Sequence, residues 1–305
     1  LPLRWQELST LQVLEKTNFK PLHIDLDLYI PGNVIYSNDN ALNTVNTQSG
    51  ITSTIAGVTD SDEYSNGYGV DARFDRVKGF IQITRSKIVV ADHYNHCQRL
   101  IDRTDSNYVS EFSGQCGYQG FRDGAKGRFG RPYFVARDVL DQNQLLITDH
   151  VNGAVRTVSL DTKVIGTLVN STTLKYLTYL TQDKATGTLY VVNKNSIHRV
   201  SYKDRVITWI AGAKKSGYLD STLLLSRFDE VCDLTLVGSD VIIAADSGND
   251  RLRLLNLKTN QISTLSTCSK DECYQPYLLL AIDNALLIGL REKIIEFKCK
   301  YKAHQ

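Results

Sequence analysis

The sequence predicts an all-β fold, a six-bladed β-propeller with four-stranded blades, formed by residues 1–305 as a single domain. Three observations lead to this prediction. A block of residues, most complete over Asp71–Gly114, returns along the chain, and repeats of this length indicate that one small sheet is copied. Helical periodicity is absent, whereas short apolar runs bounded by turn residues indicate strands. An orphan strand near each end of the chain would complete one sheet and close the ring.

The repeated block begins with an Arg-Phe step, continues through an apolar run that ends in Asp, and closes with Asn followed by Arg. Its copies are Arg73-Phe74, Asp92, Asn95 and Arg99; Arg128-Phe129, Asp149, Asn152 and Arg156; and Arg227-Phe228, Asp246, Asn249 and Arg253. A less regular copy keeps Asn195 and Arg199. Asp and Asn hydrogen-bond their own backbone in tight turns, so they indicate the turn between the second and third strands. The arginines of the Arg-Phe steps are expected to pair with these turn carboxylates.

The strands are expected in groups along the chain, with the N-terminal strand completing the last group. They are Leu8–Leu14; His23–Leu28, Val34–Ser37, Ala41–Val45 and Ile51–Ala56; Phe80–Thr84, Lys87–Ala91, Cys97–Asp102 and Tyr108–Ser113; Tyr133–Asp138, Gln144–Thr148, Ala154–Leu160 and Val164–Val169; a less regular group from Tyr176 to Gly212; a group over Val231–Gln261 with the strand at Leu265; and Tyr277–Ile282, Ala285–Leu290 and Lys293–Lys298. Leu8–Leu14 is expected to pair outside Lys293–Lys298.

The block resembles the signature of NHL-repeat propellers, a family with an Ala-Arg-Phe step and a Val-Ala-Asp-x-x-Asn turn followed by a basic residue. The Gly–Asp-Gly loop of that family has counterparts at Asn66-Gly67 and Asp123-Gly124, and a departure at Asp220-Ser221. The resemblance covers nearly the whole chain. It implies the propeller fold but not a function, because propellers host many activities.

Composition limits the classes of partner. The chain has 35 basic and 33 acidic residues and a formal net charge of +2, so it lacks the basic excess of a nucleic-acid-binding protein. No apolar run approaches the ~20 residues that span a bilayer, so no membrane partner is expected. We expect a monomer that binds a small molecule.

The cysteines and one sequon indicate a secreted glycoprotein. Six cysteines fit an oxidising compartment, and Asn170-Ser171-Thr172 is a glycosylation acceptor sequence. The chain begins at Leu1 and contains no Met, which fits a product from which a signal peptide has been removed. Disulfides are expected between Cys97 and Cys116, in a third strand and its exit loop, and between Cys268 and Cys273, which flank a short polar turn.

Candidate site residues are those that break the repeat. His93 and His150 occupy turn positions where the fifth group has Ser247, and they are expected on one rim of the ring. The strand His23–Leu28 places His23, Asp25 and Asp27 on one face, which would line the central channel. We predict that His23, Asp25, His93 and His150 form a catalytic site, since His transfers protons near neutral pH.

Further residues are expected to bind substrate or a cation. Arg73, Arg128, Tyr94 and Tyr179 are expected to hold an acidic substrate. Asp27, Asp138 and Asp233 line the predicted channel, where clustered carboxylates raise one another's pKa or recruit a cation such as calcium. A zinc site of His23, His93 and His150 is a further option, since three His ligands suit catalytic zinc. The alternative is a water-filled polar channel with structural ions, and the sequence carries no motif for an organic cofactor.

Two classes of function remain open. The first is a secreted enzyme that acts on a small acidic molecule at the channel mouth, by hydrolase or lyase chemistry or by cofactor-free oxidation as in some secreted luciferases. The second is an extracellular module that binds protein or glycan through rim tyrosines, without catalysis. The secreted peptidylglycine amidating lyases resemble this chain in architecture, but the Pro-His dipeptides of that family are absent. Amidating activity is therefore not expected.

Overall fold

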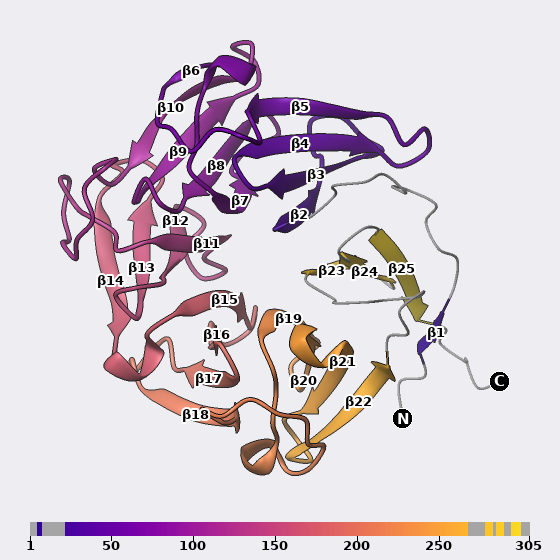
Figure 1. Ribbon diagram of the computed structural model, residues 1–305. Coiled ribbons are helices and arrows are strands. Elements are labelled where there is room, and N and C mark those ends of the chain that lie inside the picture. Colours follow the sequence, from indigo (N-terminus) through magenta and orange to yellow (C-terminus); the bar gives the residue numbers. More distant parts are fainter. Residues whose placement is uncertain (1–4, 8–21, 268–277, 283–284, 290–293, 300–305) are drawn as a thin grey trace.

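The computed structural model describes residues 5–7, 22–267, 278–282, 285–289 and 294–299. Twisted antiparallel sheets stand around a common centre like the blades of a propeller, and the first strand of each sheet is innermost (Figure 1). The prediction of an all-β propeller is confirmed. None of the helices in the described residues has the length and apolar character needed to span a membrane.

Apart from one short strand on the outer edge of the second sheet, the strands follow one another from the centre outward within each sheet. They are β2 (His23–Leu26), β3 (Asn33–Asn38), β4 (Ala41–Asn46) and β5 (Thr52–Gly57); β6 (Gly67–Tyr68), β7 (Val77–Gln82), β8 (Lys87–Asp92), β9 (Cys97–Asp102) and β10 (Tyr108–Ser113); β11 (Pro132–Arg137), β12 (Gln144–Asp149), β13 (Ala154–Ser159) and β14 (Ile165–Asn170); β15 (Leu177–Gln182), β16 (Leu189–Asn193), β17 (Ser196–Val200) and β18 (Ile207–Gly212); β19 (Val231–Val237), β20 (Val241–Asp246), β21 (Arg251–Asn256) and β22 (Gln261–Thr267); and β23 (Leu278–Ile282), β24 (Ala285–Gly289), β25 (Ile294–Cys299) and β1 (Trp5–Glu7). The 3-10 helices are η1 (Gly69–Asp71), η2 (Thr172–Leu174), η3 (Leu223–Leu225) and η4 (Ser247–Asn249).

The prediction of six four-stranded blades is wrong. Five sheets have four strands each, whereas the sheet of β7–β10 has a fifth strand, β6, on its outer edge. The fifth strand forms because the connection that follows β5 folds back against β10. There Tyr68 pairs with Tyr108, and Gly67 pairs with Val109. This extra strand covers an edge that would otherwise present unpaired backbone groups.

The two ends of the chain meet in one sheet. β1 pairs antiparallel with β25, with Trp5 opposite Cys299 and Glu7 opposite Phe297. The pairing segment is therefore Trp5–Glu7. The predicted strand Leu8–Leu14 lies outside the described residues.

Wherever side-chain burial is described, the second strand of a sheet is buried on both faces, which explains its unbroken apolar run. In β8, Ile88 and Val90 pack with Ile35 of the preceding sheet, whereas Val89 packs with Phe129 on the following side. All of these side chains are fully buried. A strand between two packed sheets has no solvent face, so its sequence does not alternate between apolar and polar residues.

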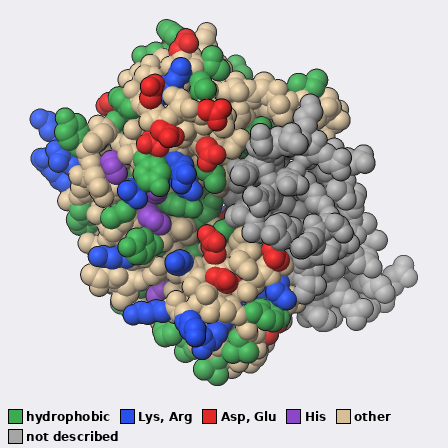
Figure 2. All heavy atoms as spheres, in the orientation of Figure 1, with side chains coloured by type: hydrophobic (Ala, Val, Ile, Leu, Met, Phe, Trp, Pro, Cys, Tyr) green, Lys and Arg blue, Asp and Glu red, His purple; other side chains and the backbone are tan. Residues whose placement is uncertain are grey.

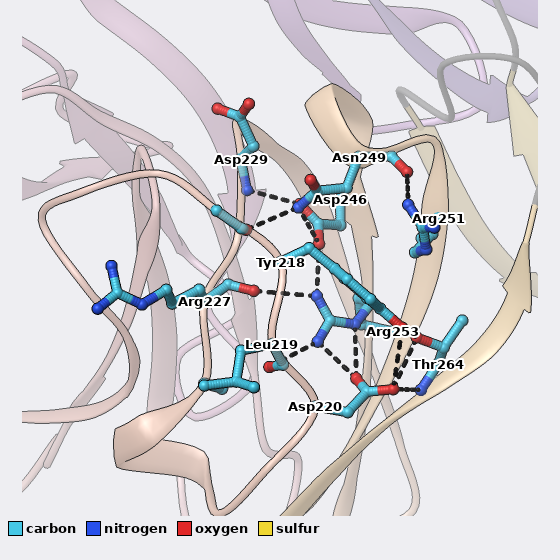
Figure 3. Close-up of polar contacts among 12 residues, drawn as sticks. Tyr218, Leu219, Asp220, Arg227, Asp229, Asp246, Asn249, Arg251, Arg253 and Thr264 are labelled. Carbon is cyan, nitrogen blue, oxygen red and sulfur yellow. Dashed lines mark hydrogen bonds and ion pairs between the residues drawn. The ribbon is translucent and has the colours of Figure 1, made fainter.

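Three buried arginines fasten sheets to the connections that precede them. Arg253 donates to Asp246 at 2.6 Å, to Asp220 at 2.6 Å and to the carbonyl oxygens of Arg227 and Leu219 at 3.0 Å (Figure 3). Its guanidinium also lies 4.9 Å from the Tyr218 ring centroid. Arg99 and Arg156 make the same set of contacts in the second and third sheets.

The arginine that holds the turn carboxylate is thus not the one of the Arg-Phe step. Arg73, Arg128 and Arg227 contribute their carbonyl oxygens to the buried guanidinium groups, and their own side chains point elsewhere. Our expectation that they pair with the turn carboxylates is wrong. The network stabilises the fold, which is the structural role expected of the turn Asp and Asn residues.

The fourth sheet lacks this network. Its turn joins Asn193 to Ser196 with two intervening residues, whereas the turn of the second sheet joins Asp92 to Cys97 with four. The shorter turn shifts the register, so the position of the buried arginine is taken by His198, opposite Trp209. Arg199, which the Asn-then-Arg spacing grouped with the others, is exposed.

Candidate functional site

The candidate site is built by the first residues of the innermost strands. In β7, β11 and β19 the ladder register shifts just after the strand begins. Such bulges re-aim side chains and are frequent beside functional sites. The residues at these bulges, Lys78, Tyr133 and Cys232, come close enough to influence one another electrostatically. Lys78 Nζ lies 5.1 Å from the centroid of the Tyr133 ring.

Beneath these residues, aromatic rings cross the centre of the propeller. The buried Tyr179 side chain donates its hydroxyl hydrogen to Leu22 O at 2.6 Å. The innermost strands contact one another in the order β2, β7, β11, β15, β19, β23 and back to β2, so β15 and β2 face each other across the centre. The Phe134 ring lies 5.0 Å from Tyr179 and 5.1 Å from His23. We call Tyr179, Phe134 and His23 the floor.

His23 and Asp25 do not share the arrangement that the sequence predicted for them. His23 Nδ1 accepts a hydrogen bond from Phe80 N at 3.1 Å, and burial lowers the pKa of His23 to about 3, so its ring is a neutral part of the floor. Asp25 lies two residues further along β2, where Gln82 donates to it at 3.2 Å. Burial raises the pKa of Asp25. The structure therefore separates Asp25 from His93 and His150.

The carboxylates predicted as metal ligands have separate partners. Asp27 forms a buried ion pair with Arg103 at 2.6 Å, and Asp138 accepts a hydrogen bond from Tyr202 at 2.5 Å. Asp233 accepts hydrogen bonds from two backbone N–H groups. In the part of the chain that the structure describes, no group of three or more His, Cys, Asp or Glu side chains is arranged to hold a metal ion. Neither calcium nor zinc is therefore proposed here.

His93 and His150 do come together above the floor. Their ring centroids lie 5.6 Å apart, and the Tyr133 ring lies 5.4 Å from each of them. His93 Nδ1 lies 3.0 Å from Pro132 O, and His150 Nδ1 lies 2.9 Å from Leu177 O. A carbonyl oxygen only accepts, so Nδ1 of each neutral ring carries the proton and Nε2 is left as an acceptor. The two rings are thus held in the same tautomer.

Burial and nearby positive charges favour the neutral form of both imidazoles. Burial lowers the pKa of His93 to about 3, and the positive charges of Lys78 and Arg131 act in the same direction. The pKa of His150 is lowered by burial and by the same two cations. A negative charge brought beside the rings would raise both pKa values, since it favours the charged form.

Three cationic side chains near His93 and His150 form no ion pair with a carboxylate of the described residues. Arg76, Lys78 and Arg131 form no ion pair with any described Asp or Glu. The Arg76 and Arg131 guanidinium groups lie 5.4 Å and 4.7 Å from the centroid of the Tyr94 ring, and Arg131 Nε is buried without a hydrogen-bond partner among the described residues. Figure 2 shows histidine, basic and hydrophobic side chains near one another on this face of the molecule. We call Arg76, Lys78 and Arg131 the cationic rim.

The other predicted substrate-binding residues have mixed positions. Tyr94 belongs to the site, because it packs against His93 with ring centroids 4.8 Å apart. Tyr179 belongs to the floor. Arg73 donates to the carbonyl oxygens of Val70 and Ala72, and Arg128 donates to Gln115, so the structure places both away from His93 and His150.

Sequence reasoning missed the cationic rim and Tyr133. We expected the innermost strand of the second sheet to begin at Phe80, whereas β7 begins at Val77 and includes Lys78. The bulge after Val77 has no marker that period-2 alternation detects. A signal was present in the repeat itself, because Lys78, Tyr133 and Cys232 hold the same place in their sheets and have unrelated side chains.

The predicted disulfide between Cys97 and Cys116 is confirmed, with a Cα–Cα distance of 5.0 Å. The predicted partners Cys268 and Cys273 lie outside the described residues. Cys232 is a free cysteine, and burial raises the pKa of its thiol to about 12, so it is not a thiolate nucleophile. Asn170 is exposed at the end of β14, and its glycosylation stays a prediction.

Comparison with known proteins supports the fold alone. No protein-family model matches the sequence, so membership of the NHL family is not confirmed, and no curated protein matches it. An auxiliary nutrient binding protein from Bacteroides ovatus is similar in structure, with a TM-score of 0.68, 12% identity and coverage of 97% of this chain and 73% of that chain.

Two further solved structures are similar at comparable identity. Virginiamycin B lyase from Staphylococcus aureus has a TM-score of 0.62 and 14% identity, over 97% of this chain and 99% of that chain. A chain of a nidogen/laminin complex has a TM-score of 0.59 and 12% identity, over 84% of each chain. The chain is thus a β-propeller whose distant structural neighbours include a lyase and a nutrient-binding protein.

Proposed function

We propose that this propeller is a secreted enzyme that binds a small acidic organic molecule above the floor and transforms it by proton transfer, as a lyase or hydrolase. The observation that carries the proposal is the cationic rim beside two imidazoles that share one tautomer. Lys78 and Tyr133 lie on strands β7 and β11, and His93 and His150 lie in the turns that follow β8 and β12.

The cationic rim supports an anionic ligand. Arg76, Lys78 and Arg131 place positive charges around one opening, and described carboxylates form no ion pair with them. Elsewhere the buried arginines of the fold, such as Arg99 and Arg156, form ion pairs with buried carboxylates. Uncompensated cations at a partly buried site attract a carboxylate, and arginine can bind it with two parallel hydrogen bonds.

The imidazoles support proton transfer once that ligand is bound. Each Nε2 is an acceptor, so His93 or His150 can remove a proton from the substrate and return it later in the reaction. Burial and the cations of the rim lower the pKa of both imidazoles, that of His93 to about 3, which makes them weaker bases. The ligand's carboxylate opposes the field of the cationic rim, so binding raises the pKa of the base and prepares it for catalysis.

The test is binding of benzoate and citrate, measured by calorimetry, together with the titration of the imidazole signals by NMR. Arg131→Gln is expected to weaken carboxylate binding by about tenfold or more, since a hydrogen bond to a charged group contributes about 1.5–3 kcal/mol. Arg122→Gln, at an exposed arginine outside the site, is the matched control. Saturating benzoate is expected to raise the pKa of His93 or His150.

Two outcomes would count against the proposal. If neither benzoate nor citrate binds, the proposal of an anionic-ligand site is wrong. Binding without any change in the imidazole pKa values would favour the second candidate, a propeller module that binds without catalysis.

Location outside the cell is part of the same proposal. The Cys97–Cys116 disulfide fits an oxidising compartment. Asn170 carries the acceptor sequence on an exposed side chain, as a glycan requires. Secretion into culture medium from a eukaryotic host, with a mass decrease on glycosidase treatment, is the expected result.

A further inference from the structure

We propose that Lys78 is a nucleophilic amine that forms a Schiff base with small carbonyl acids, that is, aldehydes or ketones that also carry a carboxylate. The inference rests on the proposed function, because it uses the same pocket and the same cationic rim. It goes further in naming the reacting group of the protein and the chemical class of the substrate.

The backbone brings the Lys78 amine over an aromatic surface. Gly79 allows β7 to approach β11 closely, since a Cβ atom there would lie 2.9 Å from Tyr133 O and 3.0 Å from Phe134 Cα. This approach sets Lys78 Nζ over the Tyr133 ring. The same ring contacts His93 and His150, and the Lys78 charge acts on both imidazoles, so the amine lies near two proton acceptors.

The surroundings of Lys78 favour the free amine, which is the nucleophilic form. Burial and, to a smaller extent, the nearby Arg76 charge lower the pKa of Lys78 to about 8, against opposing effects of Asp39, Cys232 and Glu230. At pH 7 roughly a tenth of such a side chain is unprotonated, far more than for an ordinary lysine. A desolvated lysine beside a second cation is a recognised form of activated nucleophile.

The chemistry balances with groups present in the pocket. The Lys78 nitrogen lone pair forms a bond to the carbonyl carbon as the C=O π bond opens. One of the two N–H protons passes through His93 or His150 to the oxygen and gives a carbinolamine. The second N–H proton then passes through an imidazole to the hydroxyl group, whose C–O bond breaks as the nitrogen lone pair forms the C=N bond. Water leaves, and a C=N bond replaces the C=O bond without any oxidant or reductant.

The rest of the cationic rim then holds the carboxylate. Arg131 and Arg76 flank Tyr94 at the edge of the pocket and keep their charges when Lys78 becomes an imine. A carbonyl acid therefore meets both requirements of the site. A carbonyl compound without a carboxylate can react with Lys78 but is not held by Arg76 and Arg131. A simple carboxylate is held by these arginines but forms no bond to Lys78.

The test treats the whole chain with 4-carboxybenzaldehyde and sodium cyanoborohydride at pH 7, followed by peptide mapping. Cyanoborohydride reduces the imine to a stable amine that adds a fixed mass to the modified lysine. Labelling at Lys78 is expected to be about tenfold faster than at the exposed Lys126. Benzoate is expected to compete with it, and benzaldehyde to label Lys78 more slowly than the carboxylated probe.

Lys78→Arg keeps the positive charge and removes the nucleophile. This variant is expected to lose the fast labelling, with Lys126→Arg as the matched control that keeps it. Equal labelling of Lys78 and Lys126 by a protein that binds benzoate would overturn the inference and leave the proposed function standing. If the wild-type chain does not bind benzoate, both this inference and the proposed function are wrong.

Discussion

Arg156 and Arg199 each lie four residues after an Asn in the sequence, but only Arg156 is buried in the fold. Arg156 is fully buried, and it donates to Asp149 at 3.0 Å and to Asp123 at 2.6 Å. Arg156→Ala leaves the buried Asp149 carboxylate without its cation, so we expect it to lower the free energy of unfolding by about 3–5 kcal/mol. Arg199→Ala is the control, with an expected change within about 0.5 kcal/mol. Urea denaturation measures both, and similar losses would contradict the assignment.

The same pair shows where residue-level prediction fails. Repetition indicated that Asp149 and Asn152 have structural roles, and the buried hydrogen-bond network agrees with this. The spacing from Asn195 to Arg199 gave a wrong prediction for Arg199. The turn of the fourth sheet is two residues shorter than that of the second, which changes which side chain faces inward. The turn length is set by backbone pairing across the hairpin, which residue spacing alone does not record.

Strand β19 links the fifth sheet to the C-terminal sheet through Asp233. Its carboxylate accepts the N–H of Leu279 in β23 at 2.9 Å, and burial raises the pKa of Asp233 to about 8. Between about pH 4 and about pH 8 the folded chain therefore keeps a proton that the unfolded chain has released, so stability falls as the pH rises through this window. Asp233→Asn, which does not ionise, is expected to flatten this pH dependence.

Urea midpoints at several pH values across this window measure the effect. Asp240→Asn, at an exposed position, is the control and is expected to keep the wild-type slope. An unchanged slope in Asp233→Asn would show that Asp233 does not cause the pH dependence.

At the level of the strands, the apolar runs located most elements, because packing between sheets requires them. Cys97–Asp102 and Tyr108–Ser113 have the predicted bounds. The start of β7 was less predictable, because the bulge after Val77 adds Lys78, whose position depends on contacts with the neighbouring sheet. The start of β11 at Pro132 is within one residue of the predicted start at Tyr133, but the bulge that aims the Tyr133 side chain was not predicted.

The whole ring depends on the pairing of β1 with β25. Deletion of residues 1–7 removes the pairing of Trp5, Gln6 and Glu7 and exposes the backbone edge of β25. We expect this truncation to lower the Tm by about 4 °C or more, since about 2–4 °C corresponds to each kcal/mol in larger domains. Thermal unfolding and size-exclusion chromatography measure stability and self-association. An unchanged Tm with no self-association would show that β1 is not needed for closure.

The contact of Tyr179 with Leu22 also determines how molecules move through the propeller. The hydrogen bond from Tyr179 to Leu22 joins strands on opposite sides of the centre, so the Tyr179 side chain lies across the axis of the propeller. In the enzyme that we propose, substrate and product would bind on the same side of this side chain, beside His93 and His150. A product that keeps the carboxylate is then expected to be a competitive inhibitor of its own formation.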